Sequence, residues 1–137
     1  MLARYFDLPV RGDDDGWLVA LEANRNIPFD IQRVYYIFGT QAGVRRGKHA
    51  HHALRQLMVC VAGQCAVLLD DGAQREEVRL DASERNNRGL FIDPLVWHEM
   101  FEFSKDCVLL LLADGWYDTA DYIRDYGAFK AACRGAR

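Results

Sequence analysis

The chain has 137 residues, half of them apolar, which is enough to build one ordinary domain, residues 1–137, around a real hydrophobic core. The net charge of −3 argues against a dedicated nucleic-acid-binding protein, because such proteins usually carry a large basic excess on one face. A local basic site for a phosphorylated small molecule is compatible with this charge.

Short apolar or alternating runs follow one another along the chain with turn signals between them, a pattern typical of an all-β sandwich or barrel rather than of βαβ units. The predicted strands, in chain order, are 17–21, 31–38, 43–51, 54–61, 65–69, 76–80, 90–92, 97–103 and 107–113. Turns are predicted at 13–16 and 70–72, a hairpin connection at 62–64 and a polar loop at 83–88. Between 117 and 130 the apolar spacing becomes helical, which predicts a short C-terminal helical segment with Asp118 or Thr119 as its N-cap.

The cysteines and the apolar runs indicate in which cellular compartment the protein is expected. The four cysteines show neither C-x-x-C nor zinc-knuckle spacing, and the N-terminal residues lack the apolar stretch of a signal peptide. The longest apolar run, Cys107 to Ala113, is far too short to cross a bilayer and is typical of a buried strand. We therefore expect a reduced, cytoplasmic protein with no membrane partner.

His49 and His51 are the first candidate functional residues. They stand at i and i+2 in the run 43–51, so both imidazoles project from one face if this run is a strand. Imidazole takes and gives protons near neutrality and is also the commonest metal ligand, so proton transfer and metal binding are the two chemistries to separate. The structural alternative is a pair of polar rings on the wet face of a sheet, which is the expectation for His52 on the opposite face.

The run Gly-(five residues)-His-x-His in an all-β chain resembles the first motif of the cupin superfamily, small jelly-roll barrels whose cavity holds the site. In metal-binding members a Glu follows the second His, whereas the corresponding positions here are Arg55 and Gln56. A neutral amide does not supply the anionic ligand that balances imidazoles around a divalent cation, so the sequence predicts no metal. His98, before Glu99 and Met100, is a candidate for the second-motif histidine.

The run 31–38 offers two possible inward faces. If Ile31, Arg33, Tyr35 and Ile37 line the cavity, a guanidinium and a phenol join the two histidines; the other face, with Val34, Tyr36 and Phe38 inside, would be a more ordinary core. Trp17 and Trp97 are predicted to be core or cavity-wall aromatics, with ligand stacking as the alternative.

Four blocks of sequence, 26–37, 46–51, 96–100 and 117–124, together resemble the dTDP-4-oxo-6-deoxyglucose 3,4-ketoisomerases, and the resemblance extends from about Asp7 to Lys130. It implies a cupin jelly-roll β-barrel, a homodimer, and an isomerase that needs neither metal nor cofactor. The implied substrate is a dTDP-linked 4-oxo-6-deoxy sugar, and the product is the 3-oxo isomer used in the biosynthesis of amino and deoxy sugars.

The resemblance also assigns roles. His49 is the expected base at carbon 3, His51 the partner that shuttles or returns a proton, and Tyr35 a hydrogen-bond donor to a substrate oxygen. Arg46 is expected to bind the oxyanion or the pyrophosphate, and Arg33 is a weaker candidate for binding the pyrophosphate. The expected catalytic residues are thus His49, His51 and Tyr35, and the expected substrate-binding residues are Arg46, Arg33 and His98.

One position departs from the family pattern. Asp15 stands where relatives have a cationic or tyrosyl residue linked to the configuration at carbon 4, so the product can be the axial or the equatorial alcohol; His98, where some relatives have Arg, favours the axial one. Two other functions stay open at this stage: a non-catalytic nucleotide-sugar-binding cupin and a metal-dependent cupin enzyme.

Overall fold

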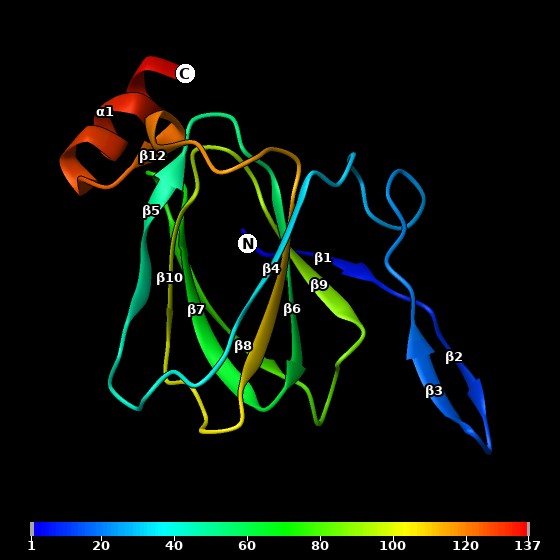
Figure 1. The fold of residues 1–137 in the computed structure, drawn as a ribbon. Helices are drawn as coiled ribbons and strands as arrows, with labels where there is room; N and C mark the ends of the chain where they lie inside the picture. Colours follow the sequence, from blue (N-terminus) through cyan, green and yellow to red (C-terminus); the bar gives the residue numbers. More distant parts are fainter. Residues whose placement is uncertain (1, 137) are drawn as a thin grey trace.

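The computed structural model describes residues 2–136, and most of them lie in antiparallel strands that form two facing five-stranded sheets (Figure 1). The first sheet has the order β1-β9-β6-β11-β4 and the second the order β12-β5-β10-β7-β8. The strands of the first sheet are β1 (Arg4–Asp7), β9 (Arg88–Ile92), β6 (Gln56–Ala62), β11 (Val108–Ala113) and β4 (Arg33–Ile37). Those of the second are β12 (Tyr122–Ile123), β5 (Arg46–His51), β10 (Trp97–Phe101), β7 (Gln64–Asp70) and β8 (Arg75–Asp81). The expected all-β jelly-roll barrel is confirmed.

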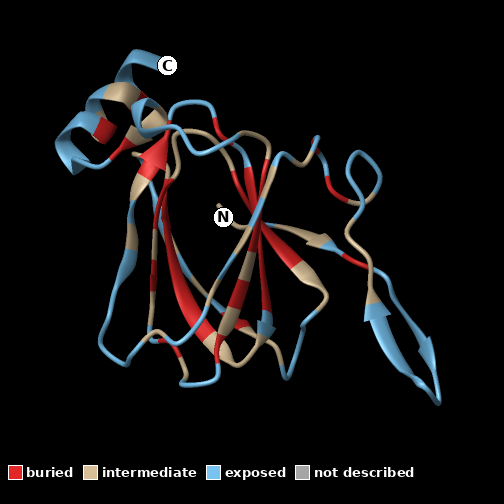
Figure 2. Ribbon diagram, in the orientation of Figure 1, coloured by how far each residue is buried: buried red, intermediate tan, exposed pale blue. Residues whose placement is uncertain are grey.

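The core lies between the two sheets, and both sheets contribute buried side chains to it. Figure 2 shows the buried residues concentrated on the strands of the barrel. Strands β6, β7, β9 and β11 are buried along most of their length, which explains why they read as continuous apolar runs rather than as alternating ones. Strand β4 alternates: Arg33, Tyr35 and Ile37 are half-buried, whereas Val34 and Tyr36 are exposed. Of the two inward faces that the sequence left open for this strand, the structure has the one with Arg33 and Tyr35.

The connection at 62–64 differs from the prediction of a hairpin. Strand β6 belongs to the first sheet and β7 to the second, so the turn at Gly63 carries the chain from one sheet to the other. Gly63 has φ +66°, and a Cβ at this position would lie 2.6 Å from the Cα of Cys107. The short Gly-containing loop was therefore correctly predicted to be a turn. The loop alone did not show that the two strands it joins belong to different sheets and do not pair with each other. Strands β7 and β8, joined through 71–74, do pair as an antiparallel hairpin.

A two-stranded hairpin, β2 (Val10–Asp13) and β3 (Gly16–Val19), projects from the barrel (Figure 1). Its turn holds Asp15, and the predicted turn at 13–16 is confirmed. Trp17 is 74% exposed on this hairpin, so the prediction that it is a core or cavity-wall residue is wrong. Trp97, in contrast, is buried against Phe129 with ring centroids 5.6 Å apart, as expected for a core aromatic.

The segment 117–130, which the sequence predicted to form turns of helix, is only partly helical in the structure. Asp118 caps a 3-10 helix, Thr119–Asp121, by accepting a hydrogen bond from the backbone of Ala120 at 3.0 Å. Strand β12 follows, and only then does α1 (Tyr126–Ala136) begin. Helix α1 covers one end of the second sheet, where the buried Phe129 anchors it. Among residues 2–136 no helix has both the length and the apolar character needed to cross a membrane.

Candidate active site

A β-bulge in β5 places the histidines. The register between β10 and β5 shifts after His98, which lies opposite His49, whereas Glu99 lies opposite Gly47, so Lys48 is the extra residue. Gly47 and Lys48 both have positive φ, and a Cβ on Gly47 would lie 2.8 Å from the carbonyl oxygen of His98. The extra residue changes the alternation of side chains along β5, so that Arg46 and His49, three positions apart, line the same cavity.

Three imidazoles, His49, His51 and His98, pack against one another inside the barrel. The ring centroid of His49 lies 5.0 Å from that of His51 and 4.7 Å from that of His98. His51 and His98 are 2% and 1% exposed, while His49 is half-buried. The cluster therefore opens to the cavity through His49, and the other two rings lie beneath it. The sequence alternative of two histidines on a wet face is excluded, and His52 is exposed as expected.

Each ring of this cluster has its Nδ1 at hydrogen-bond distance from an acceptor. The acceptors are the backbone oxygen of Gly47 for His49 (3.0 Å), the Oδ2 of Asp121 for His51 (3.2 Å) and the backbone oxygen of Val96 for His98 (3.0 Å). Carbonyl and ionised carboxylate oxygens only accept, so each Nδ1 carries the hydrogen and each Nε2 keeps its lone pair. The Nε2 of His51 is buried and has no hydrogen-bond partner among residues 2–136. The arrangement presents three imidazoles as bases.

Asp121 holds His51 and the loop that follows it. Its Oδ2 accepts from His51, and its two oxygens also accept from the backbone N–H groups of Ala53 (2.8 Å) and Leu54 (3.2 Å). The next residue, Tyr122, pairs with His51 across β12 and β5, and their ring centroids are 4.3 Å apart. Sequence reasoning missed both residues as site residues, because it placed 117–130 in helical turns and did not predict a strand that pairs with β5.

Strand β4 brings a phenol and a guanidinium to the other side of the cavity. The hydroxyl of Tyr35 accepts a hydrogen bond from the Nε2 of the buried Gln56 at 3.1 Å. The guanidinium carbon of Arg33 lies 4.3 Å from the ring centroid of Tyr35 and 5.4 Å from that of Tyr117, so the cation stacks between two aromatic rings. The predicted convergence of Arg33 and Tyr35 with the histidines is seen in the structure.

The cavity has a volume of about 660 Å³ and a cationic wall. Its lining includes His49, Tyr35 and the guanidinium groups of Arg33, Arg46 and Arg124. Within residues 2–136, none of these three arginines has a carboxylate partner within ion-pair distance. A chain with a net charge of −3 thus concentrates unpaired positive charge where a ligand can enter. Arginine pairs well with phosphate oxygens, so this wall suits a phosphorylated ligand.

Burial keeps the catalytic candidates uncharged at neutral pH. It lowers the pKa of His49, assisted by the positive charge of Arg124. Burial, followed by the neighbouring His49, lowers the pKa of His51 to about 4, although Asp121 acts in the opposite direction. The same two causes lower the pKa of His98 to about 3, and burial raises the pKa of Tyr35 to about 12 despite the nearby Arg33. The cluster is therefore a set of neutral bases facing a phenol that keeps its proton.

The three histidines also form a group that could hold a metal ion, because one ligand nitrogen from each lies within 4.8 Å of the others. All three would be neutral ligands, and no carboxylate belongs to this group within residues 2–136. The carboxylate oxygens of Asp121 accept hydrogen bonds from the Nδ1 of His51 and from the backbone N–H groups of Ala53 and Leu54, so Asp121 is not part of this group. The group therefore lacks an anionic ligand to balance the charge of a divalent cation.

The six predicted site residues divide into two groups. His49, Tyr35, Arg33 and Arg46 line the cavity, whereas His51 and His98 lie behind His49. The position that departs from the family pattern, Asp15, lies in the turn of the projecting hairpin and is not among the residues that line this cavity in its own chain.

Comparisons with known proteins agree on one group of enzymes. A family model described as FdtA, "WxcM-like, C-terminal", matches residues 1–134. The TDP-4-oxo-6-deoxy-alpha-D-glucose-3,4-oxoisomerase of Aneurinibacillus thermoaerophilus is 52% identical over 118 residues, which cover 86% of this chain and 83% of the relative.

Two solved structures extend the similarity to three dimensions. A mutant of the 3,4-ketoisomerase QdtA from Thermoanaerobacterium thermosaccharolyticum, in complex with TDP-4-keto-6-deoxyglucose, has a TM-score of 0.92 at 35% identity and covers 97% of this chain and 94% of its own. The TDP-quinovose 3,4-ketoisomerase WlaRB from Campylobacter jejuni has a TM-score of 0.88 at 41% identity and covers 95% of this chain and 98% of its own.

The imidazole cluster makes a prediction that needs no substrate. In a pH titration followed by NMR of the ring nitrogens, we expect His51 and His98 to be neutral at pH 5.5, with the hydrogen on Nδ1, because their pKa values are about 4 and about 3. The His51→Asn and His98→Asn variants assign the signals. A titration midpoint at or above 6.5 for either ring would contradict the burial and hydrogen bonding described above.

Proposed function

The chain belongs to the FdtA family, whose members include sugar-nucleotide 3,4-ketoisomerases, and we propose that it moves the ketone of a dTDP-linked 4-oxo-6-deoxyhexose from carbon 4 to carbon 3. The observation that carries this proposal is the cluster of neutral imidazoles that opens, through His49, into a cavity with a cationic wall. Proton transfer needs the first feature, and a nucleotide diphosphate needs the second.

The reaction starts at carbon 3, whose proton is acidified by the ketone at carbon 4. His49, which lines the cavity and has a lone pair on Nε2, takes this proton, and the electrons form an enediolate with its negative charge on the carbon 4 oxygen. The hydroxyl proton on the carbon 3 oxygen passes to the carbon 4 oxygen, and the proton held by the His49 imidazolium, returned to carbon 4 directly or through His51, leaves the ketone at carbon 3 and restores neutral His49. In this proposal His51 is the shuttle, since its own Nε2 has no other partner among residues 2–136.

The remaining site residues bind charge. Tyr35 keeps its proton, because its pKa is raised to about 12, and its hydroxyl donates a hydrogen bond to a sugar oxygen as negative charge develops there. Arg46 and Arg33 bind the enediolate or the pyrophosphate, and Arg124, which the sequence did not single out, adds a third guanidinium to the same wall. His98 packs against His49 from the β10 side and keeps that ring in place.

A metal-dependent cupin enzyme is the second candidate, favoured by the convergence of three histidine nitrogens within 4.8 Å. The proposal expects turnover to be unchanged after exhaustive treatment with EDTA, because every proton transfer has a protein base. Elemental analysis of the purified protein accompanies the assay. Activity that is lost on chelation and restored by one divalent metal would favour the second candidate instead.

Replacing the proposed base separates catalysis from binding. We expect His49→Asn to reduce turnover by at least about 10²-fold, since a well-placed general base contributes about 10²- to 10⁴-fold. Binding of TDP, measured by calorimetry, should stay within a few-fold of the parent value because the arginine wall is intact. Deuterium uptake at carbon 3 of a dTDP-4-oxo sugar should occur in the parent protein and disappear in the variant.

The deuterium-exchange assay also distinguishes this proposal from two alternatives: a different catalytic base and a protein that only binds the sugar nucleotide. Exchange retained in His49→Asn would remove His49 from the role of base. Binding of the sugar nucleotide by the parent protein without any exchange or product would instead support a non-catalytic nucleotide-sugar-binding cupin.

Asp121 is expected to act on catalysis through His51. Asp121→Asn replaces the acceptor that fixes the Nδ1–H form of His51, and we expect kcat to fall about 10- to 100-fold, the range typical when the partner that orients a functional imidazole is lost. KM should change little, because Asp121 does not line the cavity of the histidines.

Asp114→Asn is the matched control for this variant. Asp114 also holds the loop after β5, through the backbone N–H of Arg55 at 2.9 Å and its side chain at 2.7 Å, but it has no hydrogen bond to a histidine. If both variants lowered kcat equally, the effect of Asp121 would be on the loop rather than on His51.

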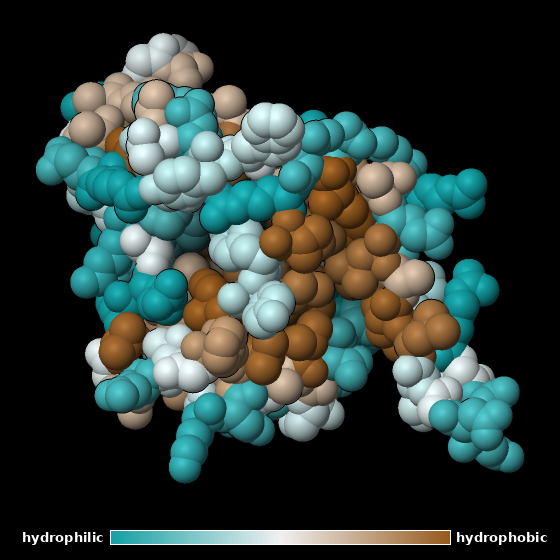
Figure 3. All heavy atoms as spheres, in the orientation of Figure 1, coloured by the Kyte–Doolittle hydropathy of each residue, from teal (hydrophilic) through white to brown (hydrophobic). Residues whose placement is uncertain are grey.

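A second copy of this chain is the proposed partner, and the exposed surface supports a homodimer. An isolated two-stranded hairpin is at best marginally stable in water, yet β2 and β3 project with Trp17 74% and Leu18 57% exposed. Strand β4 is the edge of its sheet, and Val34 and Phe38 are 57% and 67% exposed along it. Figure 3 shows apolar side chains gathered between the barrel and the base of the hairpin.

Light scattering coupled to gel filtration tests this assembly. We expect the parent chain to elute at twice the chain mass and Trp17→Asp to shift toward the monomer, because a charge would be buried in the interface. Ala131→Asp is the control: Ala131 is exposed on α1, which lies at the other end of the molecule from the hairpin (Figure 1), and its variant should remain dimeric. A monomeric parent protein would contradict the homodimer.

A cytoplasmic location is also part of the proposal. All four cysteines carry thiols rather than disulfides in the structure, as is usual for proteins in a reducing compartment. Secretion in an oxidised form would contradict it.

A further inference from the structure

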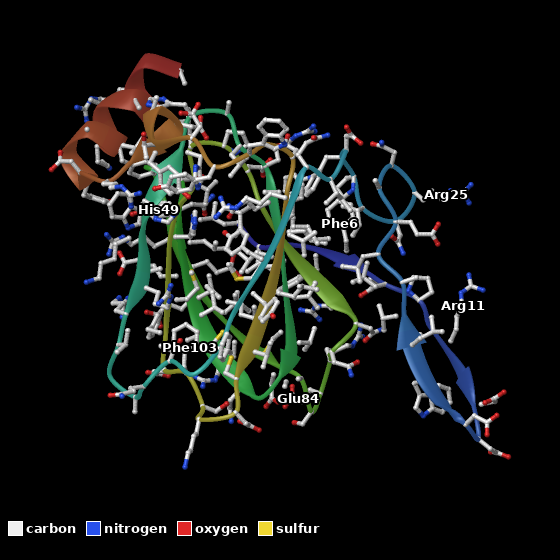
Figure 4. The ribbon with its side chains drawn as sticks, in the orientation of Figure 1. Phe6, Arg11, Arg25, His49, Glu84 and Phe103 are labelled. Atoms are coloured by element: carbon white, nitrogen blue, oxygen red, sulfur yellow. The ribbon has the colours of Figure 1, made fainter. Side chains whose placement is uncertain are left out.

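Three thiols meet in the part of the barrel core away from the imidazole cluster. Cys60 lies in β6, Cys65 in β7 and Cys107 directly before β11, and they are 1%, 0% and 3% exposed. All three belong to the same core cluster as Phe103. Figure 4 shows His49 toward the end of the barrel that carries α1, and Phe103 and Glu84 toward the opposite end. The proposed isomerase chemistry uses none of these thiols.

Cys60 and Cys107 are close enough to react with each other. Their sulfur atoms are 4.0 Å apart, and the Cys60 thiol also lies 3.3 Å from the backbone oxygen of Ala62 and 3.4 Å from that of Gly63. A disulfide needs a sulfur–sulfur distance of about 2.05 Å, so the two side chains must close by about 2 Å. The pairing of β6 with β11 is irregular next to Cys107, with a register shift after Val108, so no long regular ladder has to break.

A small cavity leads to Cys60. It has a volume of about 70 Å³, which exceeds the roughly 30 Å³ that one water occupies in the liquid, so a small oxidant fits. Besides Cys60 and Leu80, its lining consists of charged residues: Arg79, Arg85, Arg88, Asp81 and Glu84. Arg79 and Arg85 are each paired with a carboxylate, Glu102 and Asp7, so the lining is polar and close to charge balance, and it can admit a small polar oxidant.

The acidity of the thiols supports an order of events. Hydrogen bonding with Cys65 lowers the pKa of Cys60 to about 7, against the opposing effect of burial. Burial raises the pKa of Cys107 to about 12. Cys60 is therefore the thiol of the pair that ionises more readily and meets the oxidant first, whereas Cys107 stays protonated until it reacts with the oxidised Cys60.

We propose that Cys60 and Cys107 form an oxidant-sensitive thiol pair, which hydrogen peroxide converts into an intramolecular disulfide. The Cys60 thiolate attacks one peroxide oxygen, the O–O bond breaks, hydroxide leaves, and Cys60 becomes a sulfenic acid. The Cys107 sulfur then attacks the Cys60 sulfur, the S–O bond breaks as the S–S bond forms, and the departing hydroxide takes the thiol proton as water. In sum, two thiols are oxidised by two electrons and one peroxide is reduced to two waters.

The test is oxidation of the full chain by hydrogen peroxide under non-denaturing conditions, followed by alkylation, intact mass and peptide mapping. The parent chain should lose two hydrogens and two of its four titratable thiols, and the mapped linkage should join Cys60 to Cys107. Non-reducing electrophoresis should show no new dimer band, since the link is within one chain. Mapping is done on the parent chain, so the test stands even if a variant folds poorly.

Three variants sharpen the result. Cys60→Ser and Cys107→Ser should each abolish the link, while Cys133→Ser is the matched control: Cys133 is also buried, but it lies in α1, where its sulfur is 3.9 Å from the backbone oxygen of Leu95. The Cys133 variant should still form the disulfide. A parent chain that keeps all its thiols, accumulates Cys60 sulfinic acid without a link, or joins Cys60 to Cys65 would overturn the proposal.

Discussion

The burial of three uncharged imidazoles, each with its Nδ1 hydrogen already bonded, is the constraint on which the site depends. An imidazole in this interior would be costly if both nitrogens were unsatisfied, so the backbone oxygens of Gly47 and Val96 and the carboxylate of Asp121 provide one partner per ring. The remaining nitrogen of each ring then keeps its lone pair, and the same burial that lowers the pKa values keeps these rings neutral near pH 7.

The fold supplies those partners through strand pairing. The bulge at Lys48 brings β5 and β10 together with His49 opposite His98, and β12 adds Tyr122 opposite His51. Helix α1 contributes from a distance: Phe129 packs in the cluster that contains Ala50 and Ile123, so the helix helps to hold β12 against β5. The C-terminal segment thus belongs to the site although no residue of α1 itself lines the cavity.

The sequence predicted the parts of this structure that depend on local pattern. Apolar runs marked the central strands, Asp118 or Thr119 marked a helix start, and the alternation along β4 grouped Arg33 with Tyr35 on one face without deciding which face turns inward. Pairing between distant segments was not predictable in the same way. Asp121 has an ordinary position in a polar stretch, and only the tertiary pairing of β12 with β5 brings it to His51. Trp17 was predicted to be buried because it is a large aromatic residue. Nothing in the local sequence indicates that its strand pairs only with β2, in a hairpin that projects from the barrel.

The low pKa of His49 has a consequence for the chemistry itself. A neutral imidazole whose pKa is below 6.5 is a weak base toward an isolated proton, since burial and Arg124 both disfavour its charged form. In the proposed reaction, however, the proton arrives together with a negative charge on the neighbouring enediolate, and the ion pair of imidazolium and enediolate is favoured where either charge alone is not. The arginines of the wall and the Tyr35 hydroxyl act on the same negative charge, which is absent from the substrate. These interactions therefore stabilise the transition state more than the ground state, which is the condition for accelerating the chemical step.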